Sequence, residues 1–370
     1  MEKEICALEI RNTTAILTIG NVLKDEKKVN IVYQVVRPLS TFLKNGEVLD
    51  QESLTRDIKK MLVYEDLKHN IRTKINEIIL VYEPYGLDVF NSEKSGSVLS
   101  SDNLIGRNDI KNVVNSLKKE RIPNRENAII DIVPSFFLID GAKKFTEVPL
   151  GQASTDLVVN ANIYTLPERN FRDLLDAVQN AGVVISKVVI SPVGTAQLFK
   201  SYNPNIDTYV LVDCGKKSTI VSFIGNNTVY SSTWFKYGFS DLVDEVAVEF
   251  NISRGEAEDL INLYGLDSRT SVINPVICTS EIDNLKATFY ADDLNAIVSK
   301  YFKDFVEQLN AKIDSLINVY SDEEKALIKN NLSVMFIGDG LKNIALRRIL
   351  YKKLNSYIDV SINVGKIGRP

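Results

Sequence analysis

Residues 209–223, Tyr-Val-Leu-Val-Asp-Cys-Gly-Lys-Lys-Ser-Thr-Ile-Val-Ser-Phe, decide the fold of this chain. Two apolar runs flank a short polar turn, which predicts two buried strands joined by a tight hairpin with Asp213 at the bend. A hairpin that wraps a phosphate group usually carries several glycines, because backbone N–H groups must approach the phosphate oxygens without Cβ atoms in the way. In this chain Gly215 is followed by Lys216 and Lys217. The stretch therefore predicts a phosphate-loop hairpin with altered chemistry.

A second hairpin of the same layout opens the chain. Residues 5–10 and 14–19 are β-branched runs separated by a short polar turn that begins at Arg11. Two similar hairpins roughly 200 residues apart predict a duplicated α/β unit, in which each half contributes one loop to a shared cleft. Residues 28–37 and 77–82 predict further strands of the first half. An amphipathic helix is expected between them, over residues 51–66.

The middle of the chain predicts a small α+β insert that interrupts the first half. Residues 86–103 are polar and turn-rich, and Gly106 precedes a helix that should reach about Lys119, capped by Asn108 or Asp109. The expected strands of the insert cover residues 128–133, 136–139 and 157–163. The first half then resumes with a helix over 171–181, ended by Gly182, and a strand over 183–190.

The second half predicts more helix. Residues 241–250 and 253–263 are expected helices, the latter with a capping box at Ser253, and residues 285–316 are helix-rich. An apolar strand over 333–337 runs into a glycine turn and then a helix over 343–354. Such a strand-to-helix junction can place backbone N–H groups against an anion or a base.

Composition narrows the function classes. The chain has 370 residues, 45% of them hydrophobic, with a net charge of -4 and one histidine. It carries no clustered basic excess of the kind that binds nucleic acid. The one histidine, His69, lies in a charged stretch, and a serine or cysteine triad would have no other candidate base. Its cysteines are isolated, which favours a reducing cytosol over a disulfide framework or a zinc site, and Cys214 is expected to be a buried apolar residue. No signal peptide and no apolar window long enough to span a membrane are present, so membrane contact is expected to be peripheral or through a partner.

The order of these motifs resembles FtsA, the actin-like bacterial cell-division protein, over nearly the whole chain. The most specific motifs lie in the insert and the segment after it. They are residues 108–114 (Asn-Asp-Ile-Lys-Asn-Val-Val), 130–141 (Ile-Asp-Ile-Val-Pro-Ser-Phe-Phe-Leu-Ile-Asp-Gly), 148–151 (Val-Pro-Leu-Gly) and 181–194 (Ala-Gly-Val-Val-Ile-Ser-Lys-Val-Val-Ile-Ser-Pro-Val-Gly). Residues 237–245, 255–260 and 364–370 look like later motifs of the family.

The resemblance implies an α/β, actin-like ATPase fold of two duplicated ribonuclease-H-like lobes, with an inserted small α+β domain of the FtsA type, called 1C. The implied domains are a first lobe over 1–83 and 165–205, the insert over 84–164, a second lobe over 206–236 and 321–370, and a helical subdomain over 237–320.

The resemblance also implies a nucleotide site, whose loops have changed in this chain. The first loop of the family, Asp-x-Gly, is Glu9-Ile10-Arg11, and the glycine pair of the family is Tyr237-Gly238. ATP with Mg²⁺ is the implied ligand, and Glu9 and Asp213 would hold the metal through water. The positions that correspond to nucleotide contacts are Glu9, Arg11, Asn12, Thr13, Thr14, Asp213, Gly215, Lys216, Lys217, Ser218, Thr219, Gly238, Glu258, Gly338, Asp339, Gly340 and Leu341.

Two interpretations of the new cations remain open. Arg11, Lys216 and Lys217 either contact phosphate oxygens in place of backbone N–H groups, or pair with Glu9 and Asp213 in a network without ligand. Three bulky cations are hard to fit around a triphosphate. We therefore expect ATP binding to be weak or absent, with at most a weak ATPase activity and no catalytic residue.

The resemblance implies FtsZ as a partner, bound by its C-terminal tail through the helical subdomain, where the positions of the family's contact residues are Tyr301 and Asp304. Core packing is the favoured explanation of the stripe Tyr301, Phe305 and Leu309, because these residues recur at helical spacing. Self-association through the insert is also implied. The implied role is a scaffold that links FtsZ filaments to the division site, in the cytoplasm at the inner face of the cell membrane.

The sequence leaves open how the chain is attached to the membrane and which function of this fold it has. The chain ends at Pro370, before the amphipathic membrane-targeting helix of the family, so it is either truncated or attached to the membrane indirectly. A PilM-like pilus assembly protein of the same fold is one alternative function. A sugar-kinase-like enzyme that uses ATP is the other, although such enzymes need intact glycine loops.

Overall fold

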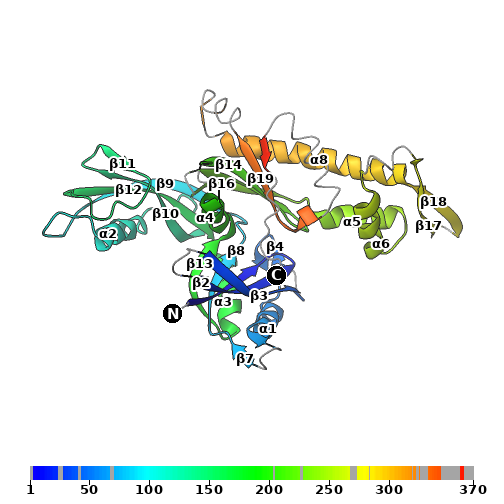
Figure 1. Ribbon diagram of the computed structural model, residues 1–370, viewed down its shortest axis with the longest axis horizontal. Helices are drawn as coiled ribbons and strands as arrows, with labels where there is room; N and C mark the ends of the chain where they lie inside the picture. Colours follow the sequence, from blue (N-terminus) through cyan, green and yellow to red (C-terminus); the bar gives the residue numbers. More distant parts are fainter. Residues whose placement is uncertain are drawn as a thin grey trace. The chain divides into compact units, whose positions relative to one another are not determined.

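The computed structural model of the chain (Figure 1) describes residues 3–23, 28–40, 43–66, 71–202, 205–225, 228–266, 273–282, 284–318, 320, 321, 325, 332–342 and 359–361. The chain divides into two units. Unit 1 comprises Met1–Asp207 and Ile224–Ser232, and unit 2 comprises Thr208–Phe223 and Thr233–Pro370.

The central sheet of unit 1 has the strand order β13-β8-β1-β2-β3. Strands β1 and β2 form the predicted N-terminal hairpin, while β8 runs parallel to both β1 and β13. Strand β3 is an edge strand, with Val29 and Val36 exposed. The elements are β1 (Lys3–Ile10), β2 (Thr14–Leu23), β3 (Lys28–Pro38), β4 (Leu43–Lys44), β5 (Glu47–Val48), β6 (Val63–Asp66), β7 (Ile71–Lys74), β8 (Glu77–Tyr82), β13 (Val184–Ile190), α1 (Gln51–Met61), α3 (Glu168–Asn180) and α4 (Ser191–Tyr202).

Helix α1 is shorter than the sequence pattern predicted. It begins at the N-cap Asp50, whose side chain accepts a hydrogen bond from Ser53 N (3.0 Å), and it buries Leu54 and Ile58. The expected continuation to residue 66 was wrong, because β6 starts at Val63 and pairs with β7. Pairing between strands overrides a short helical pattern that carries β-branched residues.

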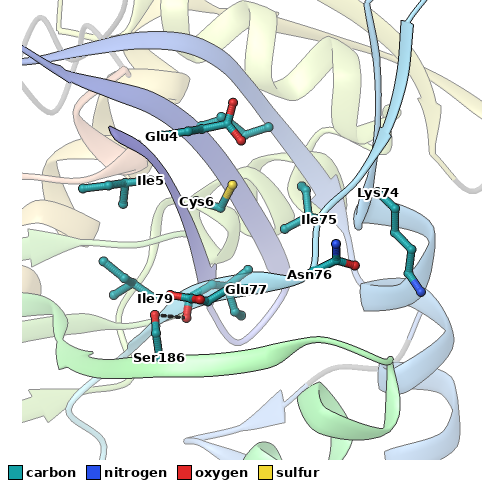
Figure 2. Close-up of a pocket in the computed structure, with 11 residues that line it drawn as sticks. Glu4, Ile5, Cys6, Lys74, Ile75, Asn76, Glu77, Ile79 and Ser186 are labelled. Atoms are coloured by element: carbon teal, nitrogen blue, oxygen red, sulfur yellow. Dashed lines mark hydrogen bonds between the residues drawn. The ribbon is translucent and has the colours of Figure 1, made fainter. Parts of the chain in front are cut away.

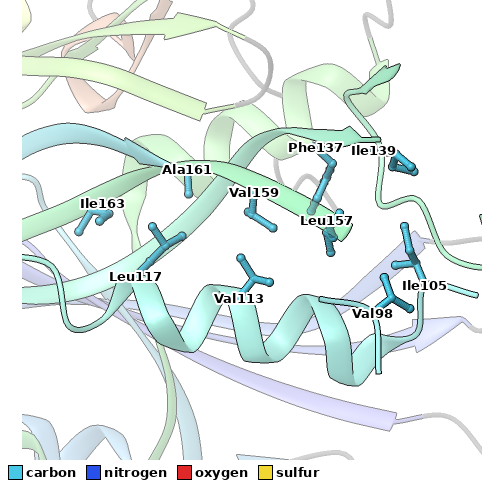
Figure 3. Packing of buried hydrophobic residues seen from close by; sticks show 10 residues of the cluster. All are labelled: Val98, Ile105, Val113, Leu117, Phe137, Ile139, Leu157, Val159, Ala161 and Ile163. Atoms are coloured by element: carbon cyan, nitrogen blue, oxygen red, sulfur yellow. The ribbon is translucent and has the colours of Figure 1, made fainter. Parts of the chain in front are cut away.

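The insert is a sheet of order β11-β10-β12-β9 covered by one helix. Figure 3 shows Val113 and Leu117 of the helix packed against Leu157, Val159 and Phe137 of the sheet. Its elements are β9 (Asp88–Ser97), α2 (Arg107–Leu117), β10 (Asn127–Ile139), β11 (Lys143–Phe145) and β12 (Asp156–Pro167).

Two expectations for the insert were wrong. The stretch expected to be turn-rich contains β9, an alternating strand that pairs with β12 along its whole length. The N-cap of α2 is Gly106, because Asp109 sits at the third helical position and accepts hydrogen bonds from Gly106 N (2.8 Å) and Leu99 N (3.0 Å). Those two bonds hold the pKa of the Asp109 carboxyl below its usual value.

Buried polar groups bind the tip of a hairpin to β12 of the insert. The hairpin joins β15 (Thr219–Gly225) to β16 (Thr228–Phe235), and its tip belongs to unit 1. Asn162 donates to Thr228 Oγ1 (3.1 Å) and to the Val229 carbonyl (3.2 Å). Tyr164 Oη accepts from Val229 N at 2.8 Å. Asn162 and Tyr164 are 1% and 0% exposed. Both partners of each hydrogen bond belong to unit 1.

The second sheet has the order β16-β15-β14-β19-β20, with β14 parallel to β19. The hairpin quoted at the outset is thus present as β14 and β15. The remaining elements are β14 (Thr208–Cys214), α5 (Phe239–Glu249), α6 (Arg254–Tyr264), β17 (Val276–Ile282), β18 (Leu285–Tyr290), α8 (Ala291–Ile317), β19 (Ser333–Ile337), η1 (Asp339–Lys342) and β20 (Asp359–Ser361).

Helix α8 supplies the long apolar stripe that the sequence predicted. Tyr301, Phe305 and Leu309 are 7%, 4% and 0% exposed, which confirms core packing for these residues. The helix begins at Ala291, later than expected, because β18 forms a hairpin with β17. The capping box predicted at Ser253 is present, with Glu256 N donating to Ser253 Oγ. The predicted helix over 343–354 and the motif over 364–370 lie outside the described residues.

No helix in the part of the chain that the structure describes is long and apolar enough to cross a membrane.

Candidate functional site

Hydrogen bonds within unit 1 hold the loop of the first hairpin. Arg11 N donates to the Thr14 carbonyl at 2.8 Å, which closes the turn. The Asn12 side chain donates to Tyr85 Oη (2.8 Å) and accepts from Gly46 N (3.3 Å), and the main-chain carbonyl of Asn12 accepts from Leu43 N at 2.9 Å. The Thr13 carbonyl accepts from Leu39 N. Asn12 and Thr13, expected as nucleotide contacts, thus tie the loop to its neighbours.

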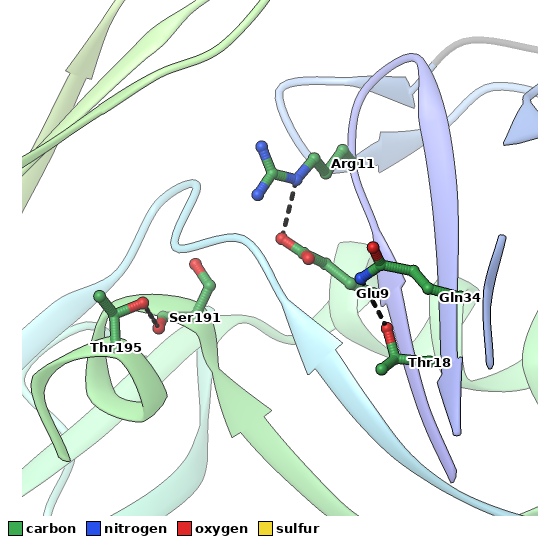
Figure 4. Close-up of polar contacts among 6 residues, drawn as sticks. All are labelled: Glu9, Arg11, Thr18, Gln34, Ser191 and Thr195. Atoms are coloured by element: carbon green, nitrogen blue, oxygen red, sulfur yellow. Dashed lines mark hydrogen bonds and ion pairs between the residues drawn. The ribbon is translucent and has the colours of Figure 1, made fainter. Parts of the chain in front are cut away.

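Glu9 and Arg11 form an ion pair at the end of β1. Arg11 Nε donates to Glu9 Oε1 at 2.8 Å, and the two side chains are 19% (Arg11) and 22% (Glu9) exposed. Figure 4 shows the guanidinium above the carboxylate, while Gln34 reaches Thr18 further along the sheet. Leu8 and Ile10 are buried, so the alternation of the strand turns Glu9 to the opposite face. This pairing is the one expected for Arg11 in the network without ligand.

The three parallel strands of unit 1 end at the same level. Ile10 pairs with Tyr82, and Tyr82 pairs with Ile190, so Arg11, Glu83 and Ser191 each follow the carboxyl end of a strand. Ligands of α/β sheets bind at this edge. Glu83 is 9% exposed, which is unusual for a carboxylate. Glu83 and Ser191 were not predicted as site residues, although each directly follows an apolar strand in the sequence.

In unit 2, glycines bring the second hairpin against the start of α5. Gly215 N donates to the Ser218 carbonyl at 2.9 Å and closes the turn. A Cβ on Gly238 would lie 2.2 Å from the Lys216 carbonyl oxygen. Ser240 N, in the first turn of α5, donates to that same oxygen at 2.9 Å. The N-terminus of α5 is therefore capped by the hairpin itself.

The turn after β19 packs on the same hairpin. Gly338 has a φ of +102°, and a Cβ there would lie 2.3 Å from Asp213 Oδ1. A Cβ on Gly340 would lie 2.9 Å from the Cys214 carbonyl oxygen, and Leu341 is buried. Gly238, Gly338 and Gly340 thus allow the hairpin, the start of α5 and the turn after β19 to pack closely within unit 2.

The other positions expected to contact nucleotide have varied surroundings. Lys216 and Lys217 are exposed, and Lys217 Nζ lies 3.9 Å from Asp244 Oδ2 on α5. Ser218 and Thr219 are buried, and Thr219 Oγ1 donates to the Tyr237 carbonyl at 2.8 Å. Two further positions complete the set, since Glu258 is exposed on α6 and Asp339 begins η1.

Aromatic side chains fill the space behind the second hairpin. Tyr301 Oη donates to the Gly238 carbonyl at 2.6 Å, and its ring centroid lies 4.5 Å from that of Tyr237. The cavity left between Cys214, Gly238, Phe305 and their neighbours measures about 10 Å³, roughly the space of one water molecule. The residues of unit 2 that the structure describes therefore form no preformed pocket of nucleotide size at this place.

Titratable groups in this region are shifted toward their neutral forms. Burial, together with the carboxylates of Asp304, Glu245 and Asp241, raises the pKa of Tyr237 to about 12. Burial and the neighbouring Asp213 raise the pKa of the Cys214 thiol. Cys214 is 2% exposed, which confirms that it is a buried apolar residue and excludes a thiolate nucleophile.

The acidic residues expected to hold Mg²⁺ do not fit that ion. Mg²⁺ keeps several waters and needs an open, hydrated carboxylate. Glu9 is bonded to Arg11, and Asp213 is 9% exposed against the Gly338 turn. Among the described residues, no group of three or more His, Cys, Asp or Glu side chains could hold a metal ion.

Figure 2 shows a separate pocket of about 390 Å³ at the other end of the unit 1 sheet. It lies between β1 and β8 on the N-terminal side of Ala7 and Ile79, the first two residues that the strands pair. Its lining includes Glu4, Cys6 and Glu77. Burial and these two carboxylates raise the pKa of the Cys6 thiol, so the thiol stays protonated. The sequence pattern contained no sign of this pocket.

Curated proteins match most of the chain. The cell division protein FtsA of Buchnera aphidicola subsp. Baizongia pistaciae is 23% identical over 314 residues, which cover 84% of this chain and 73% of that protein. FtsA of Streptococcus pneumoniae serotype 2 is 26% identical over 278 residues (74% and 59%), and FtsA of Bacillus subtilis is 20% identical over 314 residues (84% and 69%). The sequence is FtsA-like. No protein-family profile matches it.

Solved structures establish the fold of this FtsA-like chain. A chain of the PilM-PilN type IV pilus biogenesis complex superposes with a TM-score of 0.59 at 14% identity, over 96% of this chain and 90% of that one. MreB5 of Spiroplasma citri bound to AMPPNP gives 0.53 at 11% identity, over 97% and 91%. The predicted actin-like ATPase fold is thereby confirmed.

Proposed function

We propose that the chain is an actin-like cell-division scaffold that self-associates and links FtsZ filaments to the division site, in the cytoplasm at the inner face of the membrane. The observation that carries this proposal is similarity to FtsA proteins over 74–84% of the chain. The chain spans as little as 59% of one of those relatives.

Binding to FtsZ tests the proposal directly. Purified chain is titrated with a fluorescent peptide of the FtsZ C-terminal tail from the same organism, and saturable binding is expected. Tyr301 is buried and hydrogen-bonded to Gly238, so it is a framework residue and not a contact for the tail. Asp304 is half-buried on the same helix and remains a candidate contact. Asp304→Asn should weaken the peptide, while Lys303→Gln, at the exposed neighbouring position, serves as the control.

A PilM-like role is the second candidate, because the superposition on a chain of the PilM-PilN complex supports it. A peptide from the cytoplasmic end of the pilus inner-membrane partner distinguishes the two functions. Binding of that peptide without binding of the FtsZ tail would replace the division role by a pilus role.

For nucleotide, we propose weak or absent ATP binding and no ATPase function of consequence. The glycines at positions 238 and 338 are used for backbone packing, and the side chain of Lys217 is directed to Asp244. Isothermal titration with Mg-ATP should therefore show no low-micromolar affinity. A low-micromolar dissociation constant would contradict this part of the proposal.

Self-association is proposed to use the 1C-like insert, residues 84–164. The insert has a hydrophobic core of its own around Val113 and Leu117, which supports its treatment as one structural element of unit 1. Sedimentation of the full chain and of a variant lacking residues 86–157 tests this role. Equal assembly of the two proteins would exclude the insert as the interface.

A further inference from the structure

Arg11 is bonded directly to Glu9, the carboxylate that the resemblance implies as a metal-binding residue. The two residues are separated by one position on the same strand end, so their side chains lie on the same face of the sheet. The 2.8 Å bond from Arg11 Nε to Glu9 Oε1 is therefore made within one short segment of unit 1. The Arg11 N to Thr14 carbonyl bond fixes the backbone at the same point.

This ion pair changes which charges the site can accept. A guanidinium in direct contact neutralises the carboxylate, and so removes the main attraction for a second cation. It also displaces the water shell through which Mg²⁺ prefers to contact protein carboxylates. Arginine stays protonated throughout the physiological pH range, so Arg11 keeps its charge there.

The same pair suits an anion. In Figure 4 one of the two Nη atoms of Arg11 is turned away from Glu9. Arg11 also follows β1 at the carboxyl edge of the parallel strands, level with Ser191. A guanidinium at such an edge can receive a phosphate group by charge-assisted hydrogen bonds.

We propose that Arg11 replaces the divalent cation at Glu9, so that the site takes a nucleoside polyphosphate in its metal-free form. The choice of ligand rests on the weak nucleotide binding proposed above. The exclusion of metal by Arg11 stands on the ion pair alone.

Manganese binding tests the exclusion without any nucleotide. Electron paramagnetic resonance of free Mn²⁺ is followed during titration of wild-type protein, R11A, R11A/E9Q and R37A. R37A removes one exposed arginine from the same sheet and is the matched control. We expect R11A to bind Mn²⁺ at least tenfold more tightly than wild type and R37A, and the added E9Q to abolish that gain. Mn²⁺ binding by R11A that is no tighter than that of wild type overturns the role of Arg11, as does a gain in R11A that the added E9Q leaves in place.

A fluorescent ATP analogue tests the choice of ligand. Its affinity for wild-type protein is measured in EDTA and in excess Mg²⁺, with R11A and R37A in parallel. The expected result is equal or tighter binding in EDTA and at least fivefold weaker binding by R11A alone. Binding that is tenfold tighter with Mg²⁺ overturns the inference. Absence of binding in both buffers excludes the metal-free polyphosphate as the ligand and agrees with absent ATP binding, while the manganese result still decides the role of Arg11.

Discussion

At the scale of single residues, the glycines of the candidate site are explained by contacts within the chain. Gly238 lies against the backbone of Lys216 and Lys217, which a side chain cannot push aside without moving the hairpin. Tyr301 then reaches the Gly238 carbonyl from α8. These residues hold the hairpin, the start of α5 and α8 together whether or not a ligand is bound.

Gly238→Ala should therefore destabilise the protein. The new Cβ would lie 2.2 Å from the Lys216 carbonyl oxygen, and forced overpacking of this kind costs about 1–3 kcal/mol. Gly255→Ala is the matched control, because a Cβ at Gly255 meets nothing within 4 Å in the first turn of α6. Urea unfolding should give a lower midpoint for G238A and an equal or higher midpoint for G255A. Equal midpoints for the two variants would contradict the packing role.

Tyr237 should make the stability of the protein depend on alkaline pH. The native pKa of about 12 lies above the value of roughly 10 for an unfolded tyrosine, so the native state favours the neutral phenol. Its contribution is complete below about pH 10 and is lost as the pH rises to about 12. Tyr237→Phe should reduce the fall in the urea midpoint across this window. Tyr290→Phe, at a site that is 43% exposed, should leave the fall unchanged.

At the scale of elements, local patterns predicted what local forces determine. The hairpin of β14 and β15, the capping box at Ser253 and the apolar stripe of α8 follow from spacing within a short window. Strand β9 could not be predicted in this way, since its polar sequence becomes a strand only by pairing with β12, far along the chain. The candidate site was likewise predictable from the sequence only in part. Asp213 and Gly215 could be placed from sequence, but not the contact of Tyr301 with Gly238.

The docking of the β15–β16 tip on β12 should be cooperative. Asn162 and Thr228 share a buried hydrogen bond of 3.1 Å, and leaving one partner without the other costs about 1–3 kcal/mol. A double-mutant cycle of N162A and T228V should give a coupling energy of at least about 0.5 kcal/mol. The pair S154A and T228V should be additive, because Ser154 bonds to Asp140 before β12 begins. Additivity in both cycles would show that the tip is held by packing alone.

At the scale of the whole molecule, the chain passes repeatedly between two units, each with a core of its own. Leu80 of β8 and Leu309 of α8 are both fully buried, in unit 1 and unit 2 respectively. Because Ile224–Ser232 belongs to unit 1, β15 and β16 are each divided between the two units, a connection that no local sequence pattern predicts.

Each unit should respond separately to loss of its own core. Leucine-to-alanine substitutions in a core cost about 2–5 kcal/mol. Calorimetry of L80A should lower one thermal transition, and calorimetry of L309A the other. A single transition lowered equally by both substitutions would show that the units unfold together.

The packing at Gly238 has an evolutionary consequence. A glycine held in place by the neighbouring main chain stays under selection after the ligand of its loop has been lost. Among homologues of this chain, Gly238 and Gly338 should therefore be conserved where Arg11, Lys216 and Lys217 vary. Glycine patterns alone are then a poor guide to which descendants of a nucleotide-binding ancestor still bind one.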